Sequence, residues 1–388
     1  MEGLPEWVDP IGPQNPQPWQ RSAQALFEAL AGVLPGLTVA AVIAFGGTII
    51  ANGVGATLGF DRTPLSPILV SILLGLTLRN AIGLPVPYHR GVRLCQQRLL
   101  RLGVALLGFR LSLAALGSIG FAALPIVAAS ILTALVLVGW TNRVLGLHPR
   151  LGTLIAVGTA ICGNSAIVAS AAVIGAEEEE VSYAVGCVTL FGMIALLTYP
   201  FLSDVLFAGD ALSSGIFLGT AIHDTAQVAG AALLAAQYYA LPEILDTALV
   251  TKLLRNVFMI LVIPGMALLY HRRATEGANG TTRTSPSLRQ AVPGFVLGFV
   301  AMALLRTLGE FGDTPVGGLL SQTSWESIIG NISTVSTWGL MLAMSAVGLG
   351  TDLRRVRRLG LRPLAVGLVA AAVVGCVSAV GIRTLHGA

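Results

Sequence analysis

Apolar runs about 20 residues long follow one another along almost the whole chain, and each is long enough to cross a bilayer as a helix. Apolar residues make up 54% of the sequence and charged residues only 11%, whereas soluble globular chains carry roughly 25% charged residues. A chain in lipid must satisfy its backbone polar groups internally, and the alternation typical of a barrel is not visible. We therefore predict an all-α polytopic membrane protein.

The positions of the apolar runs predict about ten or eleven transmembrane helices. A Pro-rich tail at 1–28 precedes a single transmembrane domain at 29–388, whose halves are 29–207 and 208–388. The runs lie at 30–52, 64–80, 102–117, 121–140, 152–175, 181–203, 212–236, 247–270, 290–308, 328–350 and 361–382.

The basic residues lie mostly in short loops between the apolar runs, so they indicate the orientation of the chain in a membrane rather than binding of nucleic acid. If the N-terminus is cytoplasmic, 17 of the 23 basic residues fall on the cytoplasmic side and three fall outside. Cytoplasmic loops are enriched in Lys and Arg. We therefore expect a multi-pass protein of the cytoplasmic (inner) membrane with a cytoplasmic N-terminus, in which the acidic run 177–180 lies outside.

The segment 157–168, VGTAICGNSAIV, is apolar enough for a bilayer but has glycine and small polar residues at its centre. These residues predict that the helix over 152–175 is interrupted, because a break at membrane depth is tolerated where it lines a cavity or holds a ligand. Gly163, Asn164 and Ser165 would begin the second half-helix, whose free N–H groups and partial positive charge favour an anion. The alternative is a packing kink stabilised by hydroxyl groups.

Similar letters recur at 218–234, LGTAIHDTAQVAGAALL, which by our count of crossings runs parallel to the first segment. His223 and Asp224 could start a second half-helix capped by Asp224 or Thr225, with Gln227 in its first turn. We expect His223, Thr225 and Gln227 to contribute to the substrate site. Histidine side chains titrate near neutral pH, so His223 and Asp224 are candidates for coupling transport to protons. Alternatively, Asp224 only neutralises a buried cation.

Lys252 and Arg255 are three residues apart, so they lie on one face of an otherwise apolar helix. Two cations on one face predict a clamp for an anionic substrate, because charges within a bilayer are costly and mark functional sites. The competing interpretation is that both side chains snorkel to the outer surface.

The run 328–350 opens with NISTVSTW and is unusually polar for a transmembrane helix. We predict that it is the second interrupted helix and contributes Ser336 to the binding site; helix packing through hydroxyl groups is the alternative. Residues 107–120 and 347–360 share Gly and Leu positions in runs of opposite direction. This pattern favours an inverted repeat of five plus five helices after one extra N-terminal helix, with 328–350 as the counterpart of 152–175.

Five motifs together resemble the YeiH-like family of bacterial inner-membrane proteins, the sulfate-exporter family. They are GFRLS at 108–112, GTAICGNSAI at 158–167, HDTAQVAGA at 223–231, KLLR at 252–255 and MSAVGLGTDL at 344–353. The resemblance implies the fold type of bile-acid symporters and sodium/proton antiporters, with paired inverted repeats and two crossed, interrupted helices. It puts Gly163, Asn164, Ser165, His223, Gln227, Lys252 and Arg255 on family motif positions.

These observations predict a secondary transporter that moves a small inorganic or organic anion, such as a sulfate- or sulfite-like oxyanion, out of the cell by alternating access. A cation/proton antiporter and a passive anion channel are the alternatives, and an intramembrane enzyme using Ser165 and His223 is a more remote one. No nucleotide-binding, catalytic or clustered metal-ligand motif is visible, so we expect no enzyme activity, metal or cofactor. The expected partners are the anion, membrane lipid and, as an option, a second copy in a homodimer, but no nucleic acid.

Overall fold

The computed structural model describes residues 18–58, 66–275, 294–311, 314–356 and 360–387, and within these ranges the chain is helical and has no strand. Six of the described helices are long and apolar enough to cross a membrane. The prediction of an all-α polytopic membrane protein is confirmed. The six are Leu30–Val54, Leu113–Val144, Glu178–Phe207, Glu243–Met266, Gln322–Gly350 and Leu361–His386.

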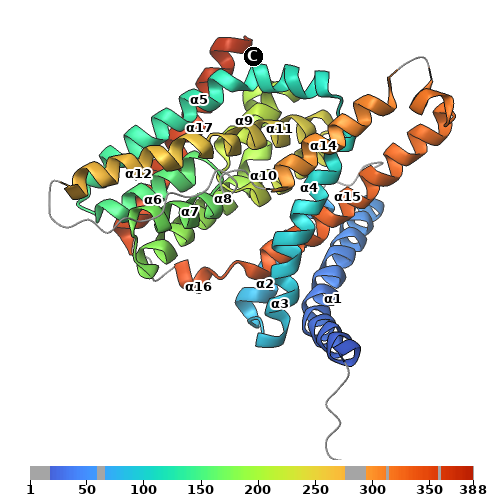
Figure 1. The fold of residues 1–388 in the computed structure, drawn as a ribbon, viewed down its shortest axis with the longest axis horizontal. Helices are drawn as coiled ribbons and strands as arrows, with labels where there is room; N and C mark the ends of the chain where they lie inside the picture. The colour runs from blue at the N-terminus through green and yellow to red at the C-terminus, as the bar shows by residue number, and fades with distance from the viewer. Residues whose placement is uncertain (1–17, 59–65, 276–293, 312–313, 357–359, 388) are drawn as a thin grey trace, which may run out of the picture.

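The helices form two bundles that lie side by side (Figure 1). The small bundle contains the N-terminal helices and two helices from late in the chain, α14 and α15. Helix α15 packs against α1, α2 and α4. Glycines let these backbones approach closely: a Cβ on Gly75 of α2 would lie 2.6 Å from the Ser345 carbonyl oxygen of α15. The small bundle consists of α1 (Pro18–Leu58), α2 (Pro67–Ala81), the continuous path η1 (Val86–Tyr88), α3 (His89–Leu94), η2 (Cys95–Leu99), α4 (Leu100–Leu107) and η3 (Gly108–Arg110), and then α14 (Gly294–Gly309) and α15 (Gln322–Gly350).

The large bundle holds the middle of the chain and its last helix. The helices α5, α11 and α17 pack around the shorter α6 and α9. Its members are α5 (Leu113–Val144), α6 (Pro149–Ala160), α7 (Asn164–Ile174), α8 (Glu178–Phe207), α9 (Ala211–Ala221), α10 (Thr225–Tyr238), α11 (Glu243–Val257), α12 (Met259–Thr275) and α17 (Leu361–His386). Two short helices, η4 (Pro315–Gly318) and α16 (Leu353–Val356), lie in the connections.

The segment 152–175 does not cross the molecule but enters and leaves on the same face. Its halves, α6 and α7, are separated by three residues. The start of α6 lies beside the start of α8, because His148 pairs with Glu180 and an Arg150 nitrogen lies 4.0 Å from a Glu177 carboxylate oxygen. Since α8 begins directly after α7, both ends of this segment, which we call hairpin 1, lie on one face of the molecule.

The segment α9–α10, which we call hairpin 2, enters from the opposite face. The helix α9 runs parallel to α11, because Gly215 lies against Thr247 and Gly219 lies against Thr251. The helix α10 ends shortly before α11 begins, so the start of α9 and the end of α10 lie on the same face. The end of α8 lies there too, since the rings of Phe201 and Tyr238 meet edge-on with centroids 5.6 Å apart.

The tips of the two hairpins meet beside the middle of α8. Gly158 of hairpin 1 lies against Val188, and Gln227 of hairpin 2 donates from Nε2 to the Thr189 carbonyl oxygen at 3.1 Å. The letters GTAI occur once in each hairpin, and in both copies the first half-helix ends at the alanine. The two copies therefore form an inverted pair, and the expectation that they run parallel is wrong.

The second interruption lies at 222–224, as the HisAsp motif suggested, and not in the run 328–350. The helix α15 is continuous from Gln322 to Gly350. Its Ser336 is fully buried and donates to the Gly103 carbonyl oxygen of α4 at 2.6 Å. This hydroxyl group packs two helices together, so the prediction of an interrupted helix there is wrong.

We call the face that holds both ends of hairpin 1 the basic face, and the other the opposite face. Arg143 and Arg150 lie at helix ends on the basic face. The expectation that the run 177–180 lies on the other side of the membrane from them is wrong, because hairpin 1 turns back and pairs with this run. Residues 1–17 of the predicted tail lie outside the described residues, and α1 begins already at Pro18.

Candidate functional site

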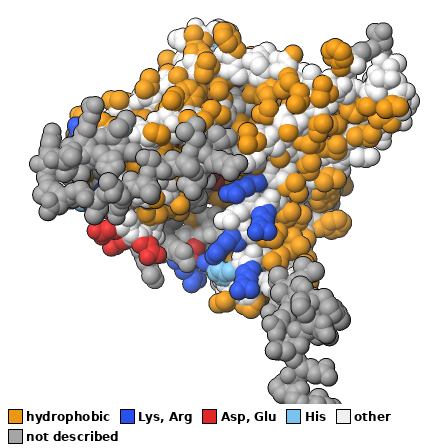
Figure 2. Space-filling model, viewed as in Figure 1, with side chains coloured by type: hydrophobic (Ala, Val, Ile, Leu, Met, Phe, Trp, Pro, Cys, Tyr) orange, Lys and Arg blue, Asp and Glu red, His pale blue; other side chains and the backbone are white. Residues whose placement is uncertain are grey.

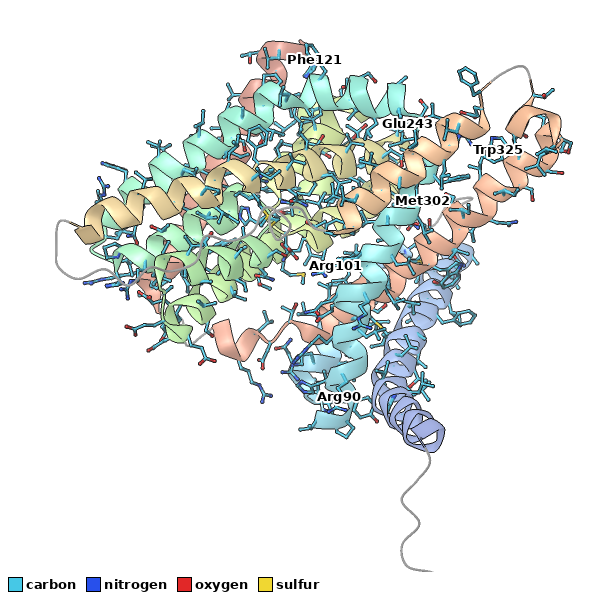
Figure 3. All side chains as sticks on the ribbon, viewed as in Figure 1. Arg90, Arg101, Phe121, Glu243, Met302 and Trp325 are labelled. Carbon is cyan, nitrogen blue, oxygen red and sulfur yellow. The ribbon has the colours of Figure 1, made fainter. Side chains whose placement is uncertain are left out.

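A cavity of about 310 Å³ lies between the two bundles, at the tips of the hairpins. The large bundle contributes the first turns of α7 and α10, and the small bundle contributes α4, α14 and α15. Figure 3 shows Arg101 on the side of α4 that faces the large bundle. The polar residues that line the cavity are Gln96, Gln97, Arg101, Asn164, Ser165, Thr189, Asp224, Thr225, Gln227 and Thr351.

The first turn of α7 borders this cavity. Its N-cap residue is Gly163, which has a φ of +67° and no side chain that could cap the helix. The next two residues, Asn164 and Ser165, line the cavity. Uncapped N–H groups at a helix N-terminus carry partial positive charge and bind anions, so the start of α7 can receive an anion.

The first turn of α10 differs, because its N-cap residue is Asp224. The Asp224 carboxylate accepts from the Gln227 N–H, and Gln227 Oε1 accepts from the Asp224 N–H at 3.4 Å. This capping box satisfies donors of the kind that α7 leaves uncapped. Gly163 and Asp224 are equivalent in the two copies and touch, since a Cβ on Gly163 would lie 3.0 Å from the Asp224 Cβ. The two tips thus present an open helix N-terminus beside a carboxylate.

A second cavity, of about 940 Å³, connects the first with the basic face. Gln96, Thr189 and Thr351 line both cavities, and the second also reaches Arg79 and Glu178. Figure 2 shows a column of basic side chains next to a hollow in this part of the surface. An anion that approaches from the basic face would meet positive charge before it reaches the hairpin tips.

Lys252 of α11 lies behind the tips and is fully buried. Its ammonium group donates to the carbonyl oxygens of Ile161 in hairpin 1 at 2.8 Å and of Ile222 in hairpin 2 at 3.0 Å. It also donates to the His223 carbonyl oxygen. An ammonium group has three donors, so none of them remains for a ligand.

Arg255, about one helical turn further along α11, is also fully buried. In hairpin 1 its guanidinium donates to the carbonyl oxygens of Thr159 and of Ala160, the latter at 2.6 Å from Nε. In hairpin 2 it donates to those of Thr220 and of Ile222, the latter at 3.2 Å. Since Thr159 and Thr220 hold the same place in the two GTAI copies, Arg255 bridges equivalent carbonyls.

These bonds give Lys252 and Arg255 a role that neither interpretation of the sequence foresaw. They satisfy the carbonyl ends of α6 and α9, which carry partial negative charge. Neither side chain lines the cavity, so in this structure Lys252 and Arg255 do not form the predicted anion clamp. Neither snorkels to the surface, since both are 0% exposed.

The structure places some of the remaining predicted site residues at the cavity and others away from it. His223 is 1% exposed, does not line the cavity, and has two ring nitrogens without a hydrogen-bond partner among the described residues. Ser336 lies in the contact between α15 and α4 and does not line the cavity, contrary to the prediction that it would stand with the other site residues. Gly163 forms the tip, and five residues line the cavity: Asn164, Ser165, Asp224, Thr225 and Gln227.

The sequence analysis missed the wall that the small bundle contributes. The sequence analysis counted Arg101 only among the many basic residues between the apolar runs. Gln96 and Gln97 precede Arg101 in one continuous helical path. The adjacent amides of Gln96 and Gln97 were the signal available in the sequence. A polar pair does not indicate which helix lies opposite. Asp246 was missed as well; it lies 3.3 Å from Arg110 and links η3 to α11.

Comparisons with known proteins identify the family. The family model described as conserved hypothetical protein 698 matches residues 35–367. The chain belongs to this family. Within it, the UPF0324 membrane protein Atu0671 of Agrobacterium fabrum is 32% identical over 331 residues, which cover 85% of this chain and 87% of that protein. The UPF0324 membrane protein TauZ of Paracoccus denitrificans is 30% identical over 366 residues, which cover 94% and 98%.

Membership in the UPF0324 family agrees with the resemblance to YeiH-like proteins and with a multi-pass location in a membrane, since these relatives are named membrane proteins. No solved structure matches the chain. Within the described residues, no three His, Cys, Asp or Glu side chains are grouped so that they could hold a metal ion. The site of this UPF0324 protein is thus built from helix N-termini, amides, hydroxyl groups and two opposite charges.

Proposed function

We propose that this UPF0324 protein is a secondary transporter that moves a small anion of the sulfate or sulfite type across the cytoplasmic membrane. The observation that carries the proposal is the uncapped N-terminus of α7, where Asn164 and Ser165 line a cavity between two bundles. Arg101 on the facing wall adds a full positive charge. An anion held between them would contact both bundles.

The position of the cavity supports alternating access. A substrate bound between two helix bundles becomes accessible from the other side when one bundle moves relative to the other. Lys252 and Arg255 each bind both hairpin tips, so the large bundle would carry its half of the site as one unit.

The proposed direction is export. The face that holds Arg143 and Arg150 would be cytoplasmic by the positive-inside rule, and the second cavity opens towards this face. In this arrangement an anion would therefore reach the site from the cytoplasm. Coupling to protons would use Asp224, which lines the cavity, rather than the buried His223.

The proposal is tested by thermal unfolding of the purified protein with sulfate, sulfite, thiosulfate, bicarbonate, halides and small carboxylates, followed by flux measurements in liposomes. A bound anion raises the unfolding temperature as its concentration exceeds its dissociation constant, and we expect this for at least one oxyanion. If no anion stabilises the protein or crosses the membrane faster than in empty vesicles, the proposal is wrong. Proton release on addition of sodium would instead favour a cation/proton antiporter.

Replacing Arg101 locates the site. Arg101→Gln removes a charge that faces the cavity, so we expect anion affinity to fall about tenfold or more while the unfolding temperature without anion stays the same. Arg98→Gln is the matched control, because Arg98 lies one turn earlier on the same helical path and does not line either cavity. Equal affinities in the two variants would exclude this cavity as the anion site.

A further inference from the structure

Six backbone carbonyl groups converge at the hairpin tips. Hairpin 1 contributes those of Thr159, Ala160 and Ile161, and hairpin 2 contributes those of Thr220, Ile222 and His223. Carbonyl groups at the C-terminal ends of half-helices coordinate a coupling cation in many secondary transporters. The tips of this protein therefore form a cluster of oxygen atoms of the kind that would otherwise attract Na⁺ or K⁺.

Two tethered cations fill this cluster. Lys252 and Arg255 are both 0% exposed, and together they donate to every one of the six carbonyl groups. The partial negative charges of the six carbonyl groups thus face cations that belong to the chain itself. We propose that Lys252 and Arg255 take the place of a dissociable coupling metal cation, so that the tips assemble, and the anion site works, without Na⁺ or K⁺. This inference rests on the proposed function only where it concerns the anion.

The choice of residue type supports this role. Lys252 is the one lysine in the chain, and the other 22 basic residues are arginines. An ammonium group is a compact point charge, whereas a guanidinium is a planar fork. A compact charge surrounded by carbonyl oxygens from both hairpins is the closest side-chain equivalent of a bound monovalent metal ion, with Ile161 and Ile222 as paired ligands.

Covalent tethering has a thermodynamic consequence. Burying a cation is costly unless good acceptors surround it, and a free ion also loses translational freedom when it binds. A cation on α11 is always present at its site, so occupancy does not depend on the ion concentration outside. The hairpin tips of this protein would therefore stay joined in any salt.

The first test uses the unmodified protein. Its unfolding temperature is measured at constant ionic strength while N-methyl-D-glucamine is exchanged for Na⁺ or K⁺, with and without sulfate or sulfite. We expect no saturable change with either metal ion, and the same anion-dependent shift in all three salts. A saturable rise with Na⁺ or K⁺, or an anion shift that requires one of them, would overturn the inference.

The two proposals fail in different ways in this experiment. An anion-dependent rise in the unfolding temperature that requires Na⁺ would agree with the transporter proposal and contradict the tethered-cation role. A protein that no anion stabilises, and that no metal cation stabilises either, contradicts the transporter but agrees with the tethered cation, because the metal titration is read without anion.

The second test restores the missing charge from solution. Lys252→Ala should lower the unfolding temperature by about 5–10 °C, and ammonium or methylammonium should recover part of this loss, because each offers N–H donors that fit the vacated space. Tetramethylammonium, which has no N–H group, should not. Thr251→Ala, which changes the adjacent fully buried residue of α11, is the control and should not respond to ammonium. A Lys252→Ala protein as stable as the unmodified one would contradict the role.

Discussion

Single residues set the chemistry of the two hairpin tips, which are otherwise close copies. Both tips follow a GTAI tetrapeptide, yet the N-cap is Gly163 in one and Asp224 in the other. Glycine leaves the first turn of α7 uncapped, while aspartate satisfies the first turn of α10 with its own carboxylate. An anion bound at α7 would therefore lie beside the Asp224 carboxyl group, whose negative charge opposes anion binding whenever the group is ionised.

Neutralising Asp224 separates its capping role from its charge. Asn caps helices about as well as Asp, so Asp224→Asn should leave the unfolding temperature nearly unchanged. It removes the acidic group of the cavity, so we expect anion affinity to rise several-fold, since two charges about 4 Å apart interact by at least about 1 kcal/mol even in water. Isothermal titration or a thermal shift series measures the change.

Asp210→Asn is the matched control for this prediction. Asp210 is the N-cap of α9 and accepts from the Ser213 N–H at 2.8 Å, but it lies on the opposite face and does not line either cavity. The same gain in affinity in both variants would indicate a general effect of net charge and would contradict a specific role of Asp224.

Among the elements, the two hairpins depend most on distant partners. A half-helix that ends inside the molecule leaves carbonyl groups without intrahelical partners, and such groups are costly away from water. Lys252 and Arg255 supply those partners for α6 and α9 at once. Helix α11 therefore holds together two segments that enter from opposite faces, and neither hairpin would be stable there alone.

Thiol labelling from each side of the membrane tests the hairpin topology. In a background with Cys95, Cys162, Cys187 and Cys376 replaced by serine, Glu179→Cys should react from the same side as Arg143→Cys, and Ala208→Cys should react from the other side. A membrane-impermeant maleimide applied to intact cells and to inverted vesicles distinguishes the sides. If 152–175 crossed the membrane, Glu179→Cys would label from the side opposite to Arg143→Cys.

At the scale of the whole molecule, the division into two bundles matters most for function. Most helix contacts lie within the small bundle or within the large bundle, and the 310 Å³ cavity takes its lining from both (Figure 1). The contact zone holds this polar-lined cavity beside apolar contacts such as that of Gly230 with Met344. An incompletely filled contact zone opposes relative motion less than a fully packed apolar core does. The bundles are therefore the units that alternating access would move.

Cross-linking the bundles tests this motion. Gln96 belongs to the small bundle and Thr189 to the large bundle, and both line the passage between the two cavities. Bridging the pair Gln96→Cys and Thr189→Cys with a short bifunctional thiol reagent should reduce anion flux in liposomes at least about tenfold, and reversing a cleavable bridge should restore it. Bridging Arg150→Cys to Glu177→Cys, which lie side by side within the large bundle, should leave flux unchanged. Full flux through the bridged Gln96–Thr189 pair would contradict motion between the bundles.

Part of this architecture could be predicted from local composition. The lengths of the apolar runs indicated a membrane protein, and the small residues around Gly163 indicated an interruption where α6 and α7 separate. The polar run that begins near Asn331 was misleading, because hydroxyl groups such as that of Ser336 serve helix packing as well as ligand binding. Local polarity does not distinguish these two uses.

The sequence by itself determined that this chain spans a membrane with helices. It also indicated an interruption in 152–175 and two cations, Lys252 and Arg255, on one face of an apolar helix. These properties depend on residues within one or two helical turns of each other. Only the tertiary structure decided that each interrupted segment turns back, that Lys252 and Arg255 bind carbonyl groups instead of an anion, and that Arg101 completes the cavity. The reason is that a broken helix can continue or reverse at similar local cost, and the choice is made by partners on α8 and α11 that are distant in the sequence.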